Sequence, residues 1–295
     1  MSLVEQAITR MRNQANAAAA KAADAASTAS APAAPAAPII NRVAGASKPA
    51  KRITVDKTAL RANGYLAEEG KEKQFGDHFR RIKRPLVEKA MSNDAAGEPR
   101  VIMITSALPG EGKTFTSINL ALSMALERDV SVLLVDCDVV KRHVGEILGL
   151  KDEVGLLDAL VDESLDIESL VIETNLPGFS ILPAGGRVET TAELLSSKRM
   201  RQLMAGLCLH NPRRIVLLDS PPLLITNEGR ALLKVAGQVV LVTRAGHTPR
   251  HAVEDAVALF GAQQAGGIVL NHAGGGGSDG YYYGYGSYGV EGNDA

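Results

Sequence analysis

The chain has 295 residues, and its 32 Lys and Arg nearly balance its 33 Asp and Glu, for a formal net charge of −1. This balance gives no electrostatic reason to expect nucleic acid or an anionic membrane surface as a partner. Two cysteines are too few for a disulfide framework. Charged residues near the start, where an export signal would have its apolar core, argue against a signal peptide. No apolar run reaches about 18 residues, so no membrane-spanning helix is predicted. We therefore expect a cytoplasmic protein.

The first 75 residues read as a segment outside the folded domain. Apolar residues over 1–12 are spaced for one face of a short amphipathic helix. Residues 15–38 are almost all Ala, Pro and Ser, which predicts a disordered linker, because such a stretch buries little and Pro interrupts helices. Residues 39–75 are mixed and polar, and no fold is assigned to them. The first domain boundary is therefore expected after residue 75.

The second segment, residues 76–273, has the pattern of an α/β domain. A helix is expected from residue 77 to about Lys83, before a break at Pro85. Short β-branched runs predict strands at 101–105, 130–135, 179–182, 214–218, 239–243 and 267–270. Helical patterns lie between them at 114–127, 141–148, 193–205, 227–235 and 250–263. This alternation predicts a mostly parallel sheet with helices on both faces.

The third segment, residues 274–295, is made of Gly, Tyr, Ser and acidic residues. It lacks the aliphatic content of a core, which predicts a disordered tail. Five of the six tyrosines lie in the last 15 residues, at Tyr281, Tyr282, Tyr283, Tyr285 and Tyr288.

A phosphate-binding loop stands at residues 106–114 (SALPGEGKT), after an apolar strand and before a helix. Gly110 and Gly112 let backbone N–H groups turn toward phosphate oxygens, and the helix N-terminus adds a favourable dipole. Lys113 can reach the β- and γ-phosphates of ATP, and Thr114 can offer its hydroxyl to Mg²⁺. The predicted nucleotide site comprises Pro109, Gly110, Glu111, Gly112, Lys113, Thr114 and Phe115.

Carboxylates follow two more predicted strands. Asp136 and Asp138 end the run 132–138 (VLLVDCD), and Asp219 ends the run 215–219 (IVLLD). The carboxyl ends of parallel strands face the crevice where ligands bind. Asp219 fits the Mg²⁺-holding position after a second strand. Asp136 and Asp138 lie at a strand end where the chain can already be turning, and only one of them is expected to point straight toward the site.

These motifs resemble those of the bacterial tyrosine kinases, P-loop proteins of exopolysaccharide synthesis and export. The resemblance runs from about residue 76 to the end, and the start MSLVEQAI is similar to autokinases of exosortase-linked systems. It implies a P-loop NTPase of the MinD/ParA-like type, with Asp138 and Asp219 in the metal site and Asp136 activating the attacking tyrosine. Asn271 is placed where related ATPases contact adenine.

The resemblance also implies an assembly. Asp77, Arg80 and Lys83 match, with two changes, a Glu-x-x-Arg-x-x-Arg motif through which relatives form rings, so a homo-oligomer is expected. Val140 stands where many relatives carry an arginine after the second aspartate. A membrane protein of the polysaccharide chain-length regulator type is the implied activator and would hold the chain peripherally at the inner membrane. A cognate tyrosine phosphatase is a further implied partner.

The function expected from these features is ATP-dependent autophosphorylation of the tail tyrosines. Oligomerisation favours phosphorylation in trans, although cis transfer stays open. One alternative is a MinD/ParA-like regulatory ATPase, but such proteins carry a signature lysine in the loop where this chain has Leu108, and they lack a tyrosine tail. A non-catalytic ATP-binding scaffold is the third reading. The cluster Arg80–Arg84 could bind a lipid head group, although a solvated or subunit-facing helix is favoured.

Overall fold

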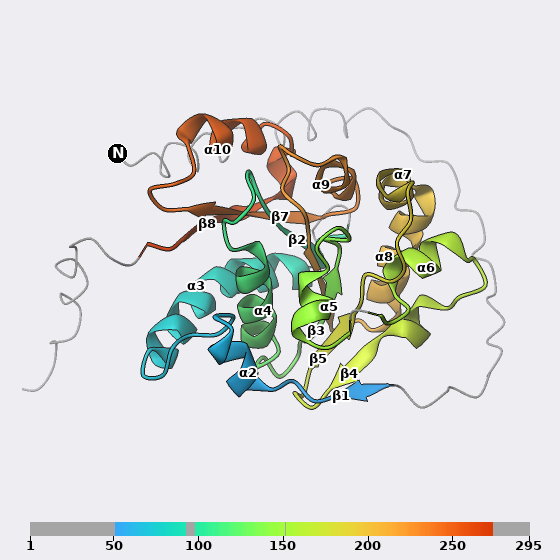
Figure 1. Cartoon of the computed structure of the whole chain (residues 1–295), viewed down its shortest axis with the longest axis horizontal. Coiled ribbons are helices and arrows are strands. Elements are labelled where there is room, and N and C mark those ends of the chain that lie inside the picture. The colour runs from blue at the N-terminus through green and yellow to red at the C-terminus, as the bar shows by residue number, and fades with distance from the viewer. Residues whose placement is uncertain (1–50, 93–97, 151, 274–295) are drawn as a thin grey trace, which may run out of the picture.

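The computed structural model describes residues 51–92, 98–150 and 152–273 (Figure 1). The predicted helix over 1–12, the linker over 15–38 and the tail over 274–295 lie outside them. The strands are β1 (Arg52–Ile53), β2 (Val101–Ser106), β3 (Ser131–Asp136), β4 (Ile172–Thr174), β5 (Phe179–Leu182), β6 (Arg214–Asp219), β7 (Gln238–Arg244) and β8 (Ala265–Asn271).

The helices alternate with these strands along the chain. The α-helices are α2 (Lys57–Ala62), α3 (Glu72–Met91), α4 (Lys113–Met124), α5 (His143–Ile147), α6 (Leu156–Val161), α7 (Thr191–Ser196), α8 (Lys198–His210), α9 (Asn227–Leu232) and α10 (Arg250–Val257), with 3₁₀ turns η2 (Ile167–Leu170) and η3 (Ala262–Gln264). Among the described helices, none is long and apolar enough to cross a membrane.

The strands form one sheet in the order β1-β4-β5-β3-β6-β2-β7-β8. Among the described strands, only the β4–β5 pair is antiparallel. The central strands β2, β3 and β6 consist of buried residues almost throughout, as expected for strands covered on both faces. The predicted mostly parallel α/β fold is confirmed.

Each face of the sheet has its own hydrophobic core, because successive strand side chains point to opposite faces. On one face Met103 of β2 joins a cluster with Leu157 of α6 and Met200 of α8. On the other face Ile104 of β2 joins a cluster with Ile118 of α4. In Figure 1, α2, α3 and α4 lie on the same side of the sheet, and α6 to α9 lie together at another part of the molecule.

The register of the parallel strands brings their carboxyl ends to one edge. Asp136 at the end of β3 is directly opposite Asp219 at the end of β6, and Ile104 of β2 is also opposite Asp219. The loop after β2 opens α4, so the segments that carry the phosphate loop and the carboxylates meet at this edge. The fold therefore gathers the predicted site from three adjacent strands.

The sheet also uses part of the 39–75 segment, for which the sequence predicted no fold. Strand β1 pairs with β4, and the backbone carbonyl of Tyr65, beyond α2, accepts a hydrogen bond of 2.7 Å from the Asn119 side chain on α4. Strand β4 itself is too short for a periodic signal. The single helix predicted over 193–205 is two helices, because the Ser197 side chain caps a new helix by accepting the Met200 N–H.

Helix α3 continues through Pro85 to Met91, so the predicted break at this proline is wrong. Pro85 lies on the exposed side of the helix, where lost main-chain pairing can be made good by water. On the opposite side Phe79, Leu86 and Ala90 are buried in the core shared with α4. Burial of this face outweighs the local cost of the proline.

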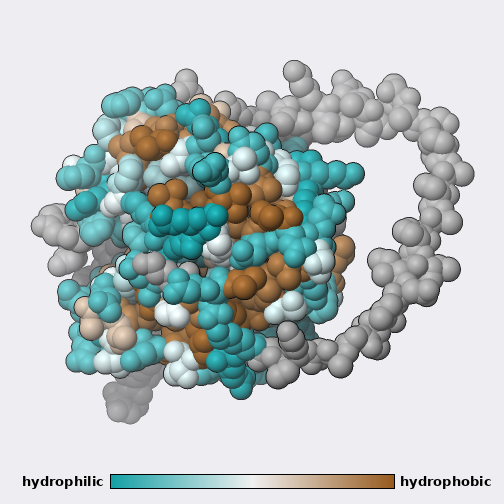
Figure 2. All heavy atoms as spheres, turned by 45° about the vertical axis from the view of Figure 1, so that its right-hand side comes forward, coloured by the Kyte–Doolittle hydropathy of each residue, from teal (hydrophilic) through white to brown (hydrophobic). Residues whose placement is uncertain are grey.

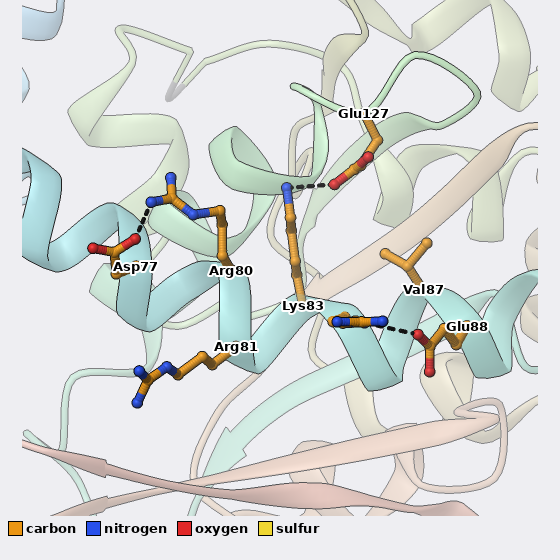
Figure 3. Close-up of a pocket in the computed structure, with 8 residues that line it drawn as sticks. Asp77, Arg80, Arg81, Lys83, Val87, Glu88 and Glu127 are labelled. Atoms are coloured by element: carbon orange, nitrogen blue, oxygen red, sulfur yellow. Dashed lines mark hydrogen bonds and ion pairs between the residues drawn. The ribbon is translucent and has the colours of Figure 1, made fainter. Parts of the chain in front are cut away.

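Lys83 on α3 is buried, in contrast to its neighbours in the basic cluster (Figure 3). Its ammonium donates to the Ser123 backbone carbonyl at 2.7 Å and pairs with Glu127 at 2.7 Å, at the end of α4. Asp77 and Arg80 pair with each other on the surface. Lys83 therefore joins α3 to the end of α4 within one chain. This contact is separate from any role of the Asp77, Arg80 and Lys83 motif in subunit assembly.

Replacing Pro85 by Ala tests the account of α3. Because residue 85 is exposed and helical, Ala restores an N–H donor and removes a ring clash, and we expect the free energy of unfolding to rise by about 1–3 kcal/mol. Urea unfolding followed by circular dichroism measures it, with the exposed Lys73→Ala on the same helix as control. A fall in stability would show that the kink geometry of the proline is needed for packing.

Candidate functional site

The phosphate loop joins β2 to α4 in a conformation that only glycine adopts easily. Gly110 and Gly112 have φ values of +78° and +94°. A Cβ built on Gly112 would lie 1.9 Å from the Asn271 side-chain nitrogen. Gly112 is therefore required both by its backbone angle and by the close approach of Asn271.

The Glu111 side chain stabilises the conformation of the phosphate loop. The side chain is buried, and its carboxylate accepts the Leu108 N–H at 2.7 Å and the hydroxyl of Thr248, which follows β7. The Asn271 amide, at the end of β8, donates to the Glu111 backbone carbonyl at 3.0 Å. Glu111 thus offers a ligand only its main chain, while its carboxylate fixes the loop to two neighbouring segments.

Phe115 also turns its side chain away from the loop. Its ring meets Phe75 edge-on with centroids 6.2 Å apart, and Phe79 lies at 6.3 Å. Its contribution to a nucleotide site is therefore through the backbone at the start of α4. Pro109 and Gly110 are exposed at the tip of the loop.

Asp219 is held by two hydroxyls of α4. Thr114 donates to one carboxylate oxygen and Ser117 to the other, each at 2.8 Å. Asp219 is fully buried, and burial raises the pKa of Asp219 to about 6 despite these hydrogen bonds. Ser117 was not predicted, although its position one turn after Thr114 on the same helix could have indicated it.

Lys113 is the buried cation of the site, with 7% of its surface exposed. Burial lowers the pKa of its ammonium, and the neighbouring Asp219 and Asp138 oppose this shift. The first residue of α4 therefore faces carboxylates on two strand ends. The structure brings Lys113, Asp138 and Asp219 together as the sequence predicted.

Asp136 is the carboxylate with an unused oxygen. It is fully buried, and one oxygen accepts the Gly145 N–H at 3.0 Å, while the other has no hydrogen-bond partner among the described residues. Burial, and next the charge of Asp219, raise the pKa of Asp136 to about 7. Asp138 is 4% exposed, and among the described residues its carboxylate accepts only a long 3.4 Å contact from the Lys141 N–H.

The donor set fits Mg²⁺ bound together with phosphate. Hydroxyl and carboxylate oxygens are its preferred ligands, and it commonly takes one or two carboxylates, waters and phosphate oxygens. In the part of the chain that the structure describes, no group of three or more His, Cys, Asp or Glu could hold a metal ion by itself. The ion would therefore depend on nucleotide oxygens as well as on Thr114, Asp138 and Asp219.

Comparison with known proteins places this site in a family. Residues 99–259 match the model of the AAA domain family, which is more than half of the chain. The chain belongs to the AAA domain family.

Two relatives of this chain are named as tyrosine-protein kinases. The chain is 32% identical over 173 residues to the tyrosine-protein kinase wzc of Salmonella typhimurium, covering 58% of this chain and 24% of that protein. It is 38% identical over 149 residues to the tyrosine-protein kinase YwqD of Bacillus subtilis, covering 50% and 61%. The chain therefore spans between about a quarter and three fifths of these relatives.

Solved structures agree with this result. The kinase domain of VpsO is 29% identical, with a TM-score of 0.57, covering 69% of this chain and 98% of that domain. The predicted resemblance to the bacterial tyrosine kinases is thus confirmed. The roles assigned to individual residues of the AAA domain stay predictions, including Asn271, whose amide is seen to contact Glu111.

Asp136 makes the stability of the nucleotide-free protein depend on pH. Its pKa is raised in the folded state, so folding favours the protonated form, and stability is lost as pH rises from about 4 through 7. The change Asp136→Asn removes this loss, and we expect it to raise the free energy of unfolding at pH 8 by about 2–3 kcal/mol relative to pH 5. Lys113, Asp138 and Asp219 remain in both proteins.

Urea unfolding in EDTA at pH 5 and pH 8 measures this difference, with the exposed Asp255→Asn as control. If the free energy of unfolding changed with pH equally in Asp136→Asn and in the unaltered chain, Asp136 would not be a buried carboxyl with a raised pKa.

Proposed function

We propose that this chain is an ATP-dependent protein-tyrosine kinase that transfers the γ-phosphoryl group of ATP to its own tail tyrosines, giving ADP and phosphotyrosine. The observation that carries the proposal is a buried oxygen of Asp136 that has no hydrogen-bond partner among the described residues and lies at the same sheet edge as the phosphate loop. The relatives named as tyrosine-protein kinases support it. The acceptors would be Tyr281, Tyr282, Tyr283, Tyr285 and Tyr288.

The phosphate loop would bind the nucleotide. Backbone N–H groups of the loop and of the α4 N-terminus face the β- and γ-phosphates, and Lys113 neutralises their oxygens. Thr114, Asp138 and Asp219 would hold Mg²⁺, which supplies charge neutralisation on the β- and γ-oxygens when bound. Because the transition state of phosphoryl transfer is loose, alignment and charge account for most of the catalysis.

Asp136 would accept the proton of the tyrosine hydroxyl. A pKa of about 7 suits a general base at neutral pH, because the carboxylate is substantially ionised and still basic enough to take a proton. Its free oxygen is not consumed by any hydrogen bond among the described residues. Asp219, by contrast, is engaged at both oxygens by Thr114 and Ser117.

We further propose that the kinase acts in an oligomer, such as a ring, and phosphorylates tails in trans. The exposed Asp77 and Arg80 of α3 are available to a second subunit, whereas Lys83 would act by holding α3 against α4. Phosphate adds about −1.5 to −2 charges per tyrosine, so tail phosphorylation would drive subunits apart. This cycle would regulate exopolysaccharide synthesis with a membrane chain-length regulator as activator and a tyrosine phosphatase to reverse it.

Incubation of the purified chain with Mg²⁺ and ATP, followed by peptide mass spectrometry, tests the activity. We expect phosphate on the 281–288 tyrosines and a loss of at least about 100-fold in Lys113→Met, because the lysine stabilises transition-state charge. Lys234→Met, at an exposed lysine outside the loop, is the control. ATP hydrolysis with an unmodified tail, with and without the membrane activator, would instead favour the regulatory ATPase.

Mixing two variants of the full chain, one without the catalytic lysine and one without acceptor tyrosines, tests transfer in trans. One protein carries Lys113→Met with an intact tail, and the other keeps Lys113 but has its five tail tyrosines changed to Phe. We expect phosphate on the first protein, with an initial rate that rises with the concentration of the second. Phosphorylation confined to chains that carry both an intact Lys113 and tyrosines would establish transfer in cis.

A further inference from the structure

A small pocket adjoins the carboxylates and is used by none of the steps above. Its volume is about 250 Å³. Val139 and Val140, directly after Asp138, form one wall, and Leu157 of α6 and Val188 line it as well. The pocket therefore begins one residue beyond the metal-site carboxylate. Drug-sized ligands occupy roughly 300–1,000 Å³, so this space suits a single side chain better than a nucleotide.

The rim of the pocket carries unused charges of both signs. Arg187, Glu189 and Glu228 contribute to its lining. Among the residues that the structure describes, none of these three side chains makes a hydrogen bond or an ion pair. A guanidinium only donates and a carboxylate accepts, whereas a phenol hydroxyl does both. Apolar walls with such a rim match the ring and the hydroxyl of tyrosine.

This pocket lies on a side of the molecule where apolar surface is exposed. Figure 2 brings forward the side that carries α6 to α9 in Figure 1, and it shows hydrophobic residues gathered among hydrophilic ones. Val140 is 66% exposed, although it borders a buried catalytic edge. An apolar residue in this position loses contact with water when a ring is bound against it.

The tyrosine-rich segment 281–288 is the occupant that fits by charge and reach. It contains only Tyr, Gly and Ser, so the segment itself carries no charge that binding would remove from water. β7, β2 and β6 lie between β8 and β3, which places these strands roughly 19 Å apart. Tyr281 lies eight residues beyond Ala273, a stretch of chain that can span roughly 28 Å. Reach thus allows the chain's own tail, and the tail of a second copy has no such limit.

We propose that this pocket binds one tail tyrosine as an anchor, so that a tyrosine two residues away presents its hydroxyl to Asp136. The inference rests on the proposed kinase function. In an extended chain, residues i and i+2 point to the same side, roughly 7 Å apart. Tyr281, Tyr283 and Tyr285 have this spacing. The clustering of tyrosines then supplies a docking residue for each of these three acceptors, and Val140 and Arg187 would contact the docking residue.

Tail variants of the full chain test the anchor by its spacing. The first keeps only Tyr281 and Tyr283, the second only Tyr283, and the third only Tyr282 and Tyr283, with all other tail tyrosines changed to Ala. We expect the initial rate of phosphorylation at Tyr283 to be at least about fivefold higher in the first than in the second, as for loss of a well-packed aromatic anchor. The third should match the second, because adjacent side chains point to opposite sides.

Changing Val140→Asp places a charge in the pocket and should reduce the ratio of the first two rates to about one. Val161→Asp, at a valine that is 58% exposed, should leave the ratio unchanged. Nucleotide binding is measured for each variant, so that a damaged ATP site is recognised. Equal rates in all three tails would overturn the anchor pocket while leaving the kinase intact. A complete absence of phosphate from every variant would overturn both.

Discussion

The burial of Asp136, Asp138 and Asp219 beside the Lys113 ammonium is the constraint on which the rest of the structure depends. Like charges in a low-dielectric edge repel, and removing them from water is costly. Lys113, two hydroxyls of α4 and one N–H of α5 offset part of this cost. Mg²⁺ and the proton of a tyrosine hydroxyl would neutralise the negative charge that remains. The site therefore favours ligands that bring positive charge.

Such an edge needs a rigid support, and the parallel sheet provides it. Asp136 and Asp219 are register partners on adjacent strands, and both strands are buried on both faces. A shift of one residue in either strand would turn its carboxylate toward a hydrophobic core. The two cores that flank the sheet therefore stabilise the positions of the charges as well as the fold.

Sequence patterns predicted this sheet and the carboxylate edge because both depend on local signals: buried β-branched runs, a glycine-rich turn and the residues that end each strand. They did not predict contacts between distant segments. Pro85 reads as a helix break until the buried opposite face of α3 is known, and β1 and β4 are too short for any period. Lys83 reads as a surface residue of a basic helix, although Ser123 and Glu127 hold it inside. Thr248 gives no signal in the sequence, and only its contact with Glu111 shows its part in the loop.

The contacts around Glu111 show why this limit matters for function. Thr248 follows β7 and Asn271 ends β8, and both contact one residue of the phosphate loop. The segment 274–295 begins two residues beyond His272, which donates its N–H to the Asn271 side chain. The hydrogen bond between Asn271 and Glu111 thus connects the phosphate loop to the end of β8, which the tyrosine-rich segment follows in the chain. A change in loop conformation that moved the Glu111 carbonyl would have to move Asn271 or break its hydrogen bond. In a kinase that modifies its own tail, nucleotide binding and the starting point of the substrate would then be set by the same few atoms.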